Sequence, residues 1–144
     1  MAESIQFDTG LIEFNLNGKK TVYFNPTDYT FIERLFSAGN TLDELEAVYD
    51  EKKNAVEDNA AFFDVGREYD AKIREVLNGI FDDDICTPCF GTLKTFSMAD
   101  GLPVWANLLY ALVDKIDSQF IEESRKTNPR LDKYVKKYES RRKK

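Results

Sequence analysis

Cys86 and Cys89, in the run Cys86-Thr87-Pro88-Cys89, are the residues whose type and spacing best fit a chemical role. A redox pair of this spacing requires a strand before it and a helix N-terminus at the first cysteine, which lowers the thiol pKa. Here the pair follows three aspartates, and their negative charge raises the pKa of a thiol. The sequence context therefore disfavours redox catalysis.

A structural zinc ion takes four ligands, whereas the chain has two cysteines and no histidine. A zinc site would need the cysteines of a second copy or the nearby aspartates. We favour a third interpretation, in which the cysteines are two small, partly buried side chains in a turn.

Asp82, Asp83 and Asp84 resemble a cation site, because hard cations bind several carboxylate oxygens. The EF-hand pattern fails, however, since its glycine position is Thr87 and its terminal glutamate position is Leu93. We expect a capping or solvated acidic loop. The sequence thus predicts no metal site and no cofactor. With no histidine and no recognisable catalytic motif, it also predicts a protein that is not an enzyme.

The charges divide the chain into two parts. Residues 127–144 hold eight of the 20 Lys and Arg residues and only two acids, a net charge of +6, whereas residues 1–126 carry −12. The sequence pI near 4.8 argues against binding of nucleic acid over the whole surface. Complementary charges favour contact between copies or with a charged partner.

The basic C-terminal segment has three interpretations: a solvated helix end, a docking surface for an acidic partner, or a nucleic-acid contact. The third supports our alternative function, a small nucleic-acid-binding or regulatory module, although the acidic body makes it the least favoured. The predicted interaction residues are Lys133, Tyr134, Lys136, Lys137, Tyr138, Arg141 and Arg142.

A length of 144 residues predicts a single domain over residues 1–144. Its parts are a β-hairpin over 1–25, a helical body over 26–126 and a basic C-terminal helix or tail over 127–144. We find no signal-peptide pattern and no run of about 20 apolar residues, so we expect a cytoplasmic protein without a membrane partner. The predicted fold class is mainly α (α+β), with the hairpin packed on about four to five helices, one of them long.

Residues Leu11 to Phe24 predict a hairpin around Asn17-Gly18. A two-residue loop would mix polar and apolar side chains on each face. A loop one residue longer pairs Ile12 with Phe24, Phe14 with Val22 and Leu16 with Lys20, which gives one apolar face. We therefore expect a longer or bulged turn.

The run Asn25-Pro26-Thr27-Asp28 predicts the start of a short helix that ends at Gly39, and Thr41 then predicts a new N-terminus. An apolar stripe continues from Leu42 to Ile80. As one helix it would be about 58 Å long, against a diameter of roughly 40 Å for a compact chain of this size. We expect a break at 57–59 or at Gly66, or a projecting end that packs on another subunit.

Residues 81–101 predict a loop or short helix. Pro103 predicts the start of another helix, with a core face of Trp105, Leu108, Leu109, Leu112, Ile116 and Phe120. Asn128-Pro129 predicts the start of the last helix. Aromatic residues at helical spacing, Phe62, Phe63 and Trp105 among them, are more often core than pocket lining.

The hairpin that leads into Phe24-Asn25-Pro26-Thr27-Asp28, the long charged helix, the segment 100–107 and the ending 133–138 together resemble small tail-region proteins of Gram-positive phages and prophages. The closest in character are the tail assembly chaperones of long-tailed phages. The resemblance implies a non-enzymatic, mainly helical, self-associating protein that coats the tape-measure protein until tail-tube subunits replace it. It implies homo-oligomers, with the tape-measure or tail-tube protein as further partners, located in the host cytoplasm.

Overall fold

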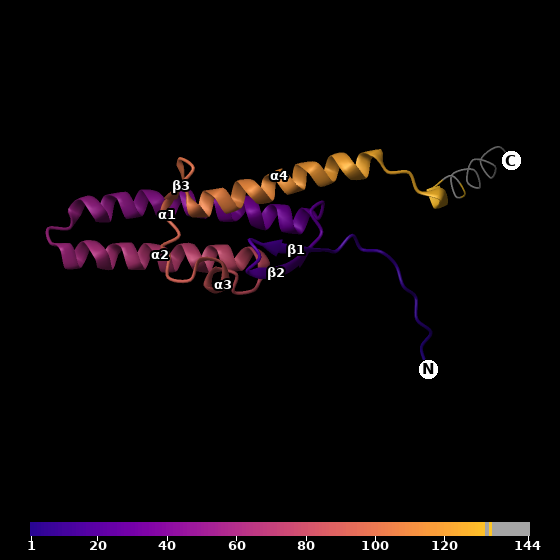
Figure 1. The fold of residues 1–144 in the computed structure, drawn as a ribbon, viewed down its shortest axis with the longest axis horizontal. Coiled ribbons are helices and arrows are strands. Elements are labelled where there is room, and N and C mark those ends of the chain that lie inside the picture. The colour runs from indigo at the N-terminus through magenta and orange to yellow at the C-terminus, as the bar shows by residue number, and fades with distance from the viewer. Residues whose placement is uncertain (132, 134–144) are drawn as a thin grey trace.

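The computed structural model describes residues 1–131 and 133, and it is mainly helical with an N-terminal β-hairpin, as predicted. Strands β1 and β2 are followed by two long antiparallel helices, a short helix, a small second hairpin and a further long helix (Figure 1). The elements are β1 (Ile12–Leu16), β2 (Lys20–Phe24), α1 (Tyr29–Ala55), α2 (Asn59–Phe81), α3 (Cys86–Phe90), β3 (Met98–Ala99), β4 (Leu102–Pro103) and α4 (Val104–Arg125).

Helix α1 is continuous through Gly39, so the predictions of a stop at Gly39 and a new N-terminus at Thr41 were wrong. Thr41 lies inside the helix, and its hydroxyl donates to the carbonyl of Ser37 at 3.0 Å. Both predictions relied on local signals. Those signals are outweighed by one buried stripe on α1, because a glycine in a helix costs only about 1 kcal/mol. The stripe consists of Phe31, Leu35, Ala38 and Leu42.

The long apolar pattern breaks between Ala55 and Asn59, at the first of the two predicted positions. Asp58 forms the N-cap of α2 by accepting from the backbone N–H of Ala61 at 2.7 Å. Gly66, the other predicted position, lies inside α2. The break lets α1 and α2 fold back on each other, which buries Tyr69, Ile73, Leu77 and Ile80 of α2.

The predicted hairpin register is confirmed: Ile12 pairs with Phe24, Phe14 with Val22 and Leu16 with Lys20. The longer turn uses positive φ at Asn17 and Gly18, of 54° and 70°. The apolar face packs on the helices of the same chain. Phe24 stacks on Phe31 with a centroid distance of 4.1 Å.

The aspartate run closes α2 and opens α3. Asp82 is the left-handed C-cap of α2. Asp83 pairs with Lys20 of β2 at 2.9 Å, and Lys20 lowers the Asp83 pKa. Asp84 accepts from the backbone N–H of Thr87 at 3.1 Å. These contacts match the expected capping loop.

A buried polar network ties the loop after α3 to helix α2. Asp70 is 6% exposed and accepts from the backbone N–H and the hydroxyl of Thr95, at 2.7 and 2.8 Å. Arg74 donates to Asp70 at 2.9 Å and to the carbonyls of Gly91 and Leu93 at 2.7 Å each. The loop 91–97 is therefore held by charge-assisted hydrogen bonds.

Helix α4 begins after Pro103 as predicted and runs alongside part of α1 (Figure 1). Its predicted core face is buried at Trp105, Leu112 and Ile116, but Phe120 is 41% exposed because this end of α4 extends past α1 and α2.

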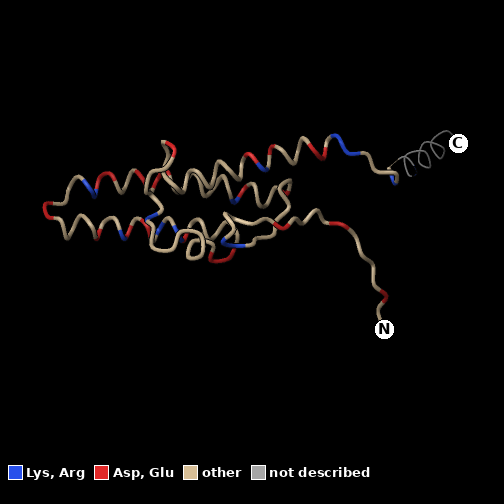
Figure 2. Tube along the Cα trace, viewed as in Figure 1, with Lys and Arg blue, Asp and Glu red and all other residues tan. Residues whose placement is uncertain are grey.

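Residues 129–131 and 133 are helical, and Asn128 caps them by accepting from the N–H of Arg130 at 2.9 Å. Basic residues gather at this end of the described chain, while both signs alternate along the body (Figure 2). Within residues 1–131 and 133, no helix is long and apolar enough to cross a membrane.

Candidate functional site: a groove beside helix α4

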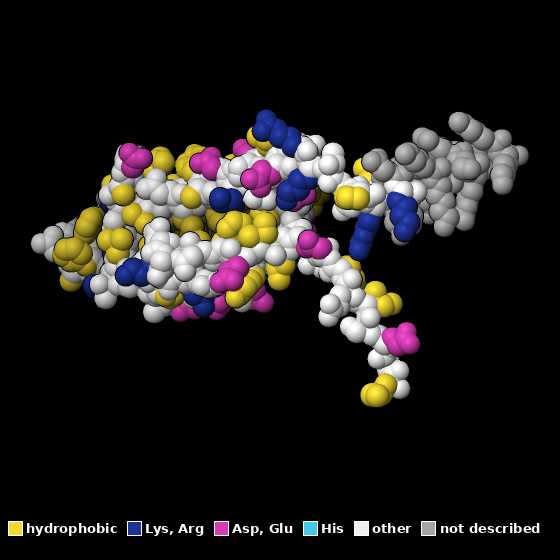
Figure 3. Space-filling model, turned by 45° about the vertical axis from the view of Figure 1, so that its right-hand side comes forward, with side chains coloured by type: hydrophobic (Ala, Val, Ile, Leu, Met, Phe, Trp, Pro, Cys, Tyr) yellow, Lys and Arg dark blue, Asp and Glu magenta, His cyan; other side chains and the backbone are white. Residues whose placement is uncertain are grey.

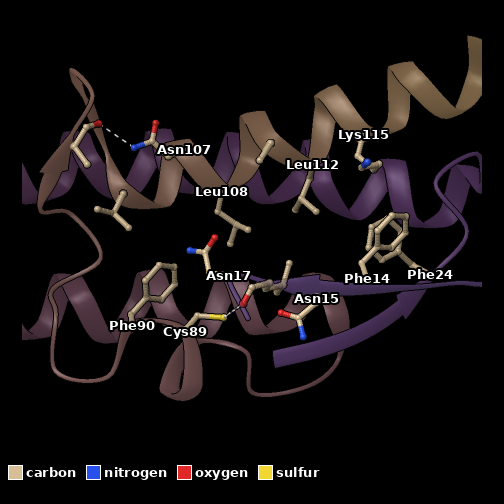
Figure 4. A pocket seen from close by; sticks show the side chains of 14 residues that line it. Phe14, Asn15, Asn17, Phe24, Cys89, Phe90, Asn107, Leu108, Leu112 and Lys115 are labelled. Atoms are coloured by element: carbon tan, nitrogen blue, oxygen red, sulfur yellow. Dashed lines mark hydrogen bonds between the residues drawn. The ribbon is translucent and has the colours of Figure 1, made fainter. Parts of the chain in front are cut away.

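A groove of about 450 Å³ lies between the hairpin β1–β2, the short helix α3 and the first half of α4 (Figure 4). Each wall is fixed by a feature described above: the hairpin by its register, α3 by the aspartate caps, and α4 by its buried residues. The apolar lining side chains, which we use to define the groove, include Phe14, Leu16, Phe24, Phe90, Leu108 and Leu112.

The polar part of the lining is small. It consists of Asn15, Asn17, Asn107 and Lys115, together with the thiol of Cys89. Asn107 donates to the carbonyl of Ala99 at 2.9 Å, which fixes the start of α4 against the second hairpin. The Nζ of Lys115 lies 5.8 Å from the centroid of the Phe14 ring, which itself stacks on Phe24 at 4.5 Å. Lys115 is the one charged residue of the lining.

The groove is suited to binding rather than to proton transfer. Its lining contains no carboxylate, so Lys115 has no acid or base partner there. An apolar trough with a few amides and one cation is typical of sites that bind an apolar group and orient it through a few polar contacts.

Both cysteines are free, and they contact different elements: Cys86 contacts α2, and Cys89 contacts strand β1. Cys86 is 1% exposed, with its thiol 3.7 Å from the carbonyl oxygen of Arg74. The thiol of Cys89 lies 3.9 Å from the carbonyl oxygen of Leu16 in the groove wall. Burial raises the pKa of Cys86 to about 12 and also raises that of Cys89. A protonated thiol is a poor nucleophile, so the surroundings favour the structural interpretation.

Residues 1–131 and 133 contain no group of three or more His, Cys, Asp or Glu side chains placed to hold a metal ion.

Of the predicted interaction residues, the structure describes only Lys133, which is exposed in the helical segment after Asn128. The remaining six lie outside the described residues: Tyr134, Lys136, Lys137, Tyr138, Arg141 and Arg142. The prediction of the basic segment as an interaction surface stays a prediction.

Large apolar side chains are exposed in several places. Residues 1–9, which we name the arm, are all exposed, with Ile5 at 87% and Phe7 at 76% (Figure 3). Phe62 and Phe63 of α2 are 39% and 60% exposed, so the expectation that they are core was wrong for them. They lie near the start of α2, and Figure 1 shows that α4 does not reach this end of the α1–α2 pair.

The sequence interpretation missed both the groove and the arm. Four of the groove's lining residues were expected to face inward: Phe14 and Leu16 of the hairpin, and Leu108 and Leu112 of α4. The sequence pattern does not show that these two faces leave a gap between them. The arm did have a signal: Ile5 and Phe7 alternate with polar residues in a segment without Lys or Arg.

Comparison of the chain with protein-family models, with curated proteins and with solved structures found no match.

Proposed function

We propose that this protein is a non-enzymatic, self-associating protein of phage or prophage tail morphogenesis, acting as a tail assembly chaperone that binds the tape-measure protein. The observation that supports self-association is that one chain has both an exposed arm with apolar side chains and an open apolar groove. Soluble monomers seldom expose large apolar side chains in clusters, and such clusters mark interaction surfaces.

The tail-assembly role draws on the resemblance of the hairpin, the long charged helix and the basic ending to tail-region proteins. A chaperone of an elongated apolar protein needs surfaces that bind copies of itself or its client. An elongated helical body with exposed side chains at Phe36, Phe63 and Tyr110 offers such surfaces.

The test is size exclusion with light scattering on the full chain and on a chain ending at Thr127, over a range of concentration and salt. We expect oligomers that grow with concentration. If the basic segment also docks on the acidic body, the truncated chain will associate more weakly, and added salt will weaken the full chain in the same way. A strict monomer at high concentration in low salt would contradict the proposal.

The client is tested by co-expression with the tape-measure protein encoded in the same genome. We expect a complex that purifies together and keeps the tape-measure protein soluble. An insoluble tape-measure protein with no copurification would reject the chaperone role while leaving self-association intact.

The alternative function, a nucleic-acid-binding or regulatory module, is favoured by the net charge of +6 over residues 127–144. It predicts duplex DNA binding with a steep salt dependence that is lost in the chain ending at Thr127. Absence of DNA binding at low salt would reject this alternative function.

A further inference from the structure

The arm is attached to the body by a specific structure at its base. Asn25 donates from its side chain to the carbonyl of Thr9 at 2.8 Å, and Gly10 donates from its backbone to the Asp8 carboxylate at 2.8 Å. Gly10 has φ +75°, and a Cβ at this position would lie 2.4 Å from the Asn25 Nδ2. The direction in which the arm leaves the body is therefore fixed, and Figure 1 shows it leading away from the hairpin.

The arm has the pattern of an extended peptide that inserts one face into a trough. In an extended chain, side chains two positions apart point the same way, about 7 Å apart. Glu3, Ile5 and Phe7 therefore share one face, which carries two apolar side chains and one carboxylate. All three residues are exposed in this structure.

The groove offers what that face requires. Its apolar walls and a volume of about 450 Å³ accommodate two side chains the size of Ile and Phe. Lys115 is the charged residue of its lining, and the arm has acidic side chains but no basic ones. Asp8 is already bonded at the base of the arm, which leaves Glu3 as the carboxylate for Lys115.

We propose that the arm of one copy docks in the groove of a second copy, with Ile5 and Phe7 in the apolar trough and Glu3 near Lys115. This inference rests on the proposed self-association and gives it a structural basis. An arm entering its own groove must reverse direction at Thr9 and Gly10, where the Asn25 and Asp8 hydrogen bonds hold the outward course. The groove of a second copy can be entered without breaking them.

The charge contact is tested by exchange. Lys115→Glu and Glu3→Lys each weaken dimer formation by about threefold, as expected for a partly exposed ion pair. The double variant restores the dissociation constant of the unmodified chain. A double variant no better than either single variant would overturn the assignment of this pair.

Variants of the arm and the groove test the apolar contact separately. Ile5→Ser with Phe7→Ser removes the apolar face of the arm. Ala111→Glu fills the groove from an exposed helical position and places a carboxylate four residues before Lys115. The matched controls are Tyr29→Ser, since Tyr29 is 77% exposed, and Ala71→Glu on the exposed face of α2. Circular dichroism of each variant checks the fold.

The deciding experiment mixes the arm variant with the groove variant, one of them fluorescently labelled, and measures association by sedimentation. Each variant alone is expected to dissociate at a concentration at least about tenfold higher than the unmodified chain, given the area of two apolar side chains. The mixture is expected to form a heterodimer, because one intact arm meets one intact groove.

If the unmodified chain associates but the variants alone associate equally well, the arm–groove contact is rejected and self-association stands. If the variants are monomeric and the mixture stays monomeric, exchange between copies is likewise rejected. If the unmodified chain is itself a monomer, the proposed function and the inference fail together.

Discussion

The Asp70 network and the groove both border the α3 segment, and they differ in how completely the chain covers them. In the network, Asp70, Thr95 and Arg74 satisfy one another within a buried environment. In the groove, Phe90 and Cys89 face an open apolar trough. Cys86 is buried, whereas Cys89 lines the groove.

This difference in coverage indicates that the Asp70 network serves folding and that the groove serves association. Buried polar groups must be paired within the chain, because an unpaired one costs about 1–3 kcal/mol. An apolar trough has no such requirement, and it can remain open until another segment covers it. The Asp70 network is thus fully hydrogen-bonded in a single copy. The groove and the arm, in contrast, each expose apolar side chains that a second copy could cover.

The largest effect is expected in the closed interior. Leu77→Ala, at a fully buried position, will lower the free energy of unfolding by about 2–5 kcal/mol. Leu108→Ala in the groove wall will lower it by under about 2 kcal/mol, because this side chain is already partly exposed. Urea denaturation of both variants measures the difference. Equal losses would mean that the groove is as closed as the core.

The Asp70 network comes next. Asp70→Ala removes three hydrogen bonds and leaves Arg74 without its carboxylate, which will cost about 2–4 kcal/mol. The matched control is Asp64→Ala, whose exposed pair with Arg67 is worth less than about 1 kcal/mol. Thermal melts of the two variants give the comparison, and similar shifts for both would show that the network adds no stability.

The two thiols are expected to differ in reactivity, with Cys86 buried and Cys89 in the wall of the groove. Because folding raises the Cys86 pKa from 9.0 to about 12, stability is unaffected by this group below about pH 9 and falls as the pH rises from there toward 12. Cys86→Ala will remove that part of the alkaline loss. At pH 8, iodoacetamide will modify Cys89 faster than Cys86. Faster modification of Cys86 would contradict the closed environment assigned to it.

The smallest effect on stability is expected in the arm. Phe7→Ser will change the free energy of unfolding of the dilute monomer by less than about 0.5 kcal/mol, because the side chain is 76% exposed in the single chain. The same substitution will weaken association. Urea denaturation at low concentration checks the first statement, and a loss above 1 kcal/mol would show that the arm already packs within its own chain.

Much of the fold was predictable because local patterns and burial agreed. The hairpin register followed from requiring one apolar face, and the break before Asn59 followed from a run of polar residues. The stop at Gly39 failed because glycine and threonine signals are weak against a continuous buried stripe. The Asp70 network was missed, since an aspartate inside a helical stripe gives no sign of a partner 25 residues away.

The candidate site was less predictable than the fold. The sequence pointed to Cys86 and Cys89 and to the basic segment, because reactive and charged residues are recognisable by type alone. The groove is a gap between two apolar faces, one on the hairpin and one on α4. In the sequence, residues of these faces such as Phe14 and Leu108 have the pattern of ordinary core residues. Its volume arises only when the hairpin, α3 and α4 are placed together.

The most direct test of the central claim is backbone hydrogen exchange of the full chain at low and high protein concentration. We expect the amides of residues 2–8 to become protected only at high concentration, while those around Leu77 are equally protected at both. Rapid exchange throughout the arm at every concentration would contradict the docking of the arm on a second copy.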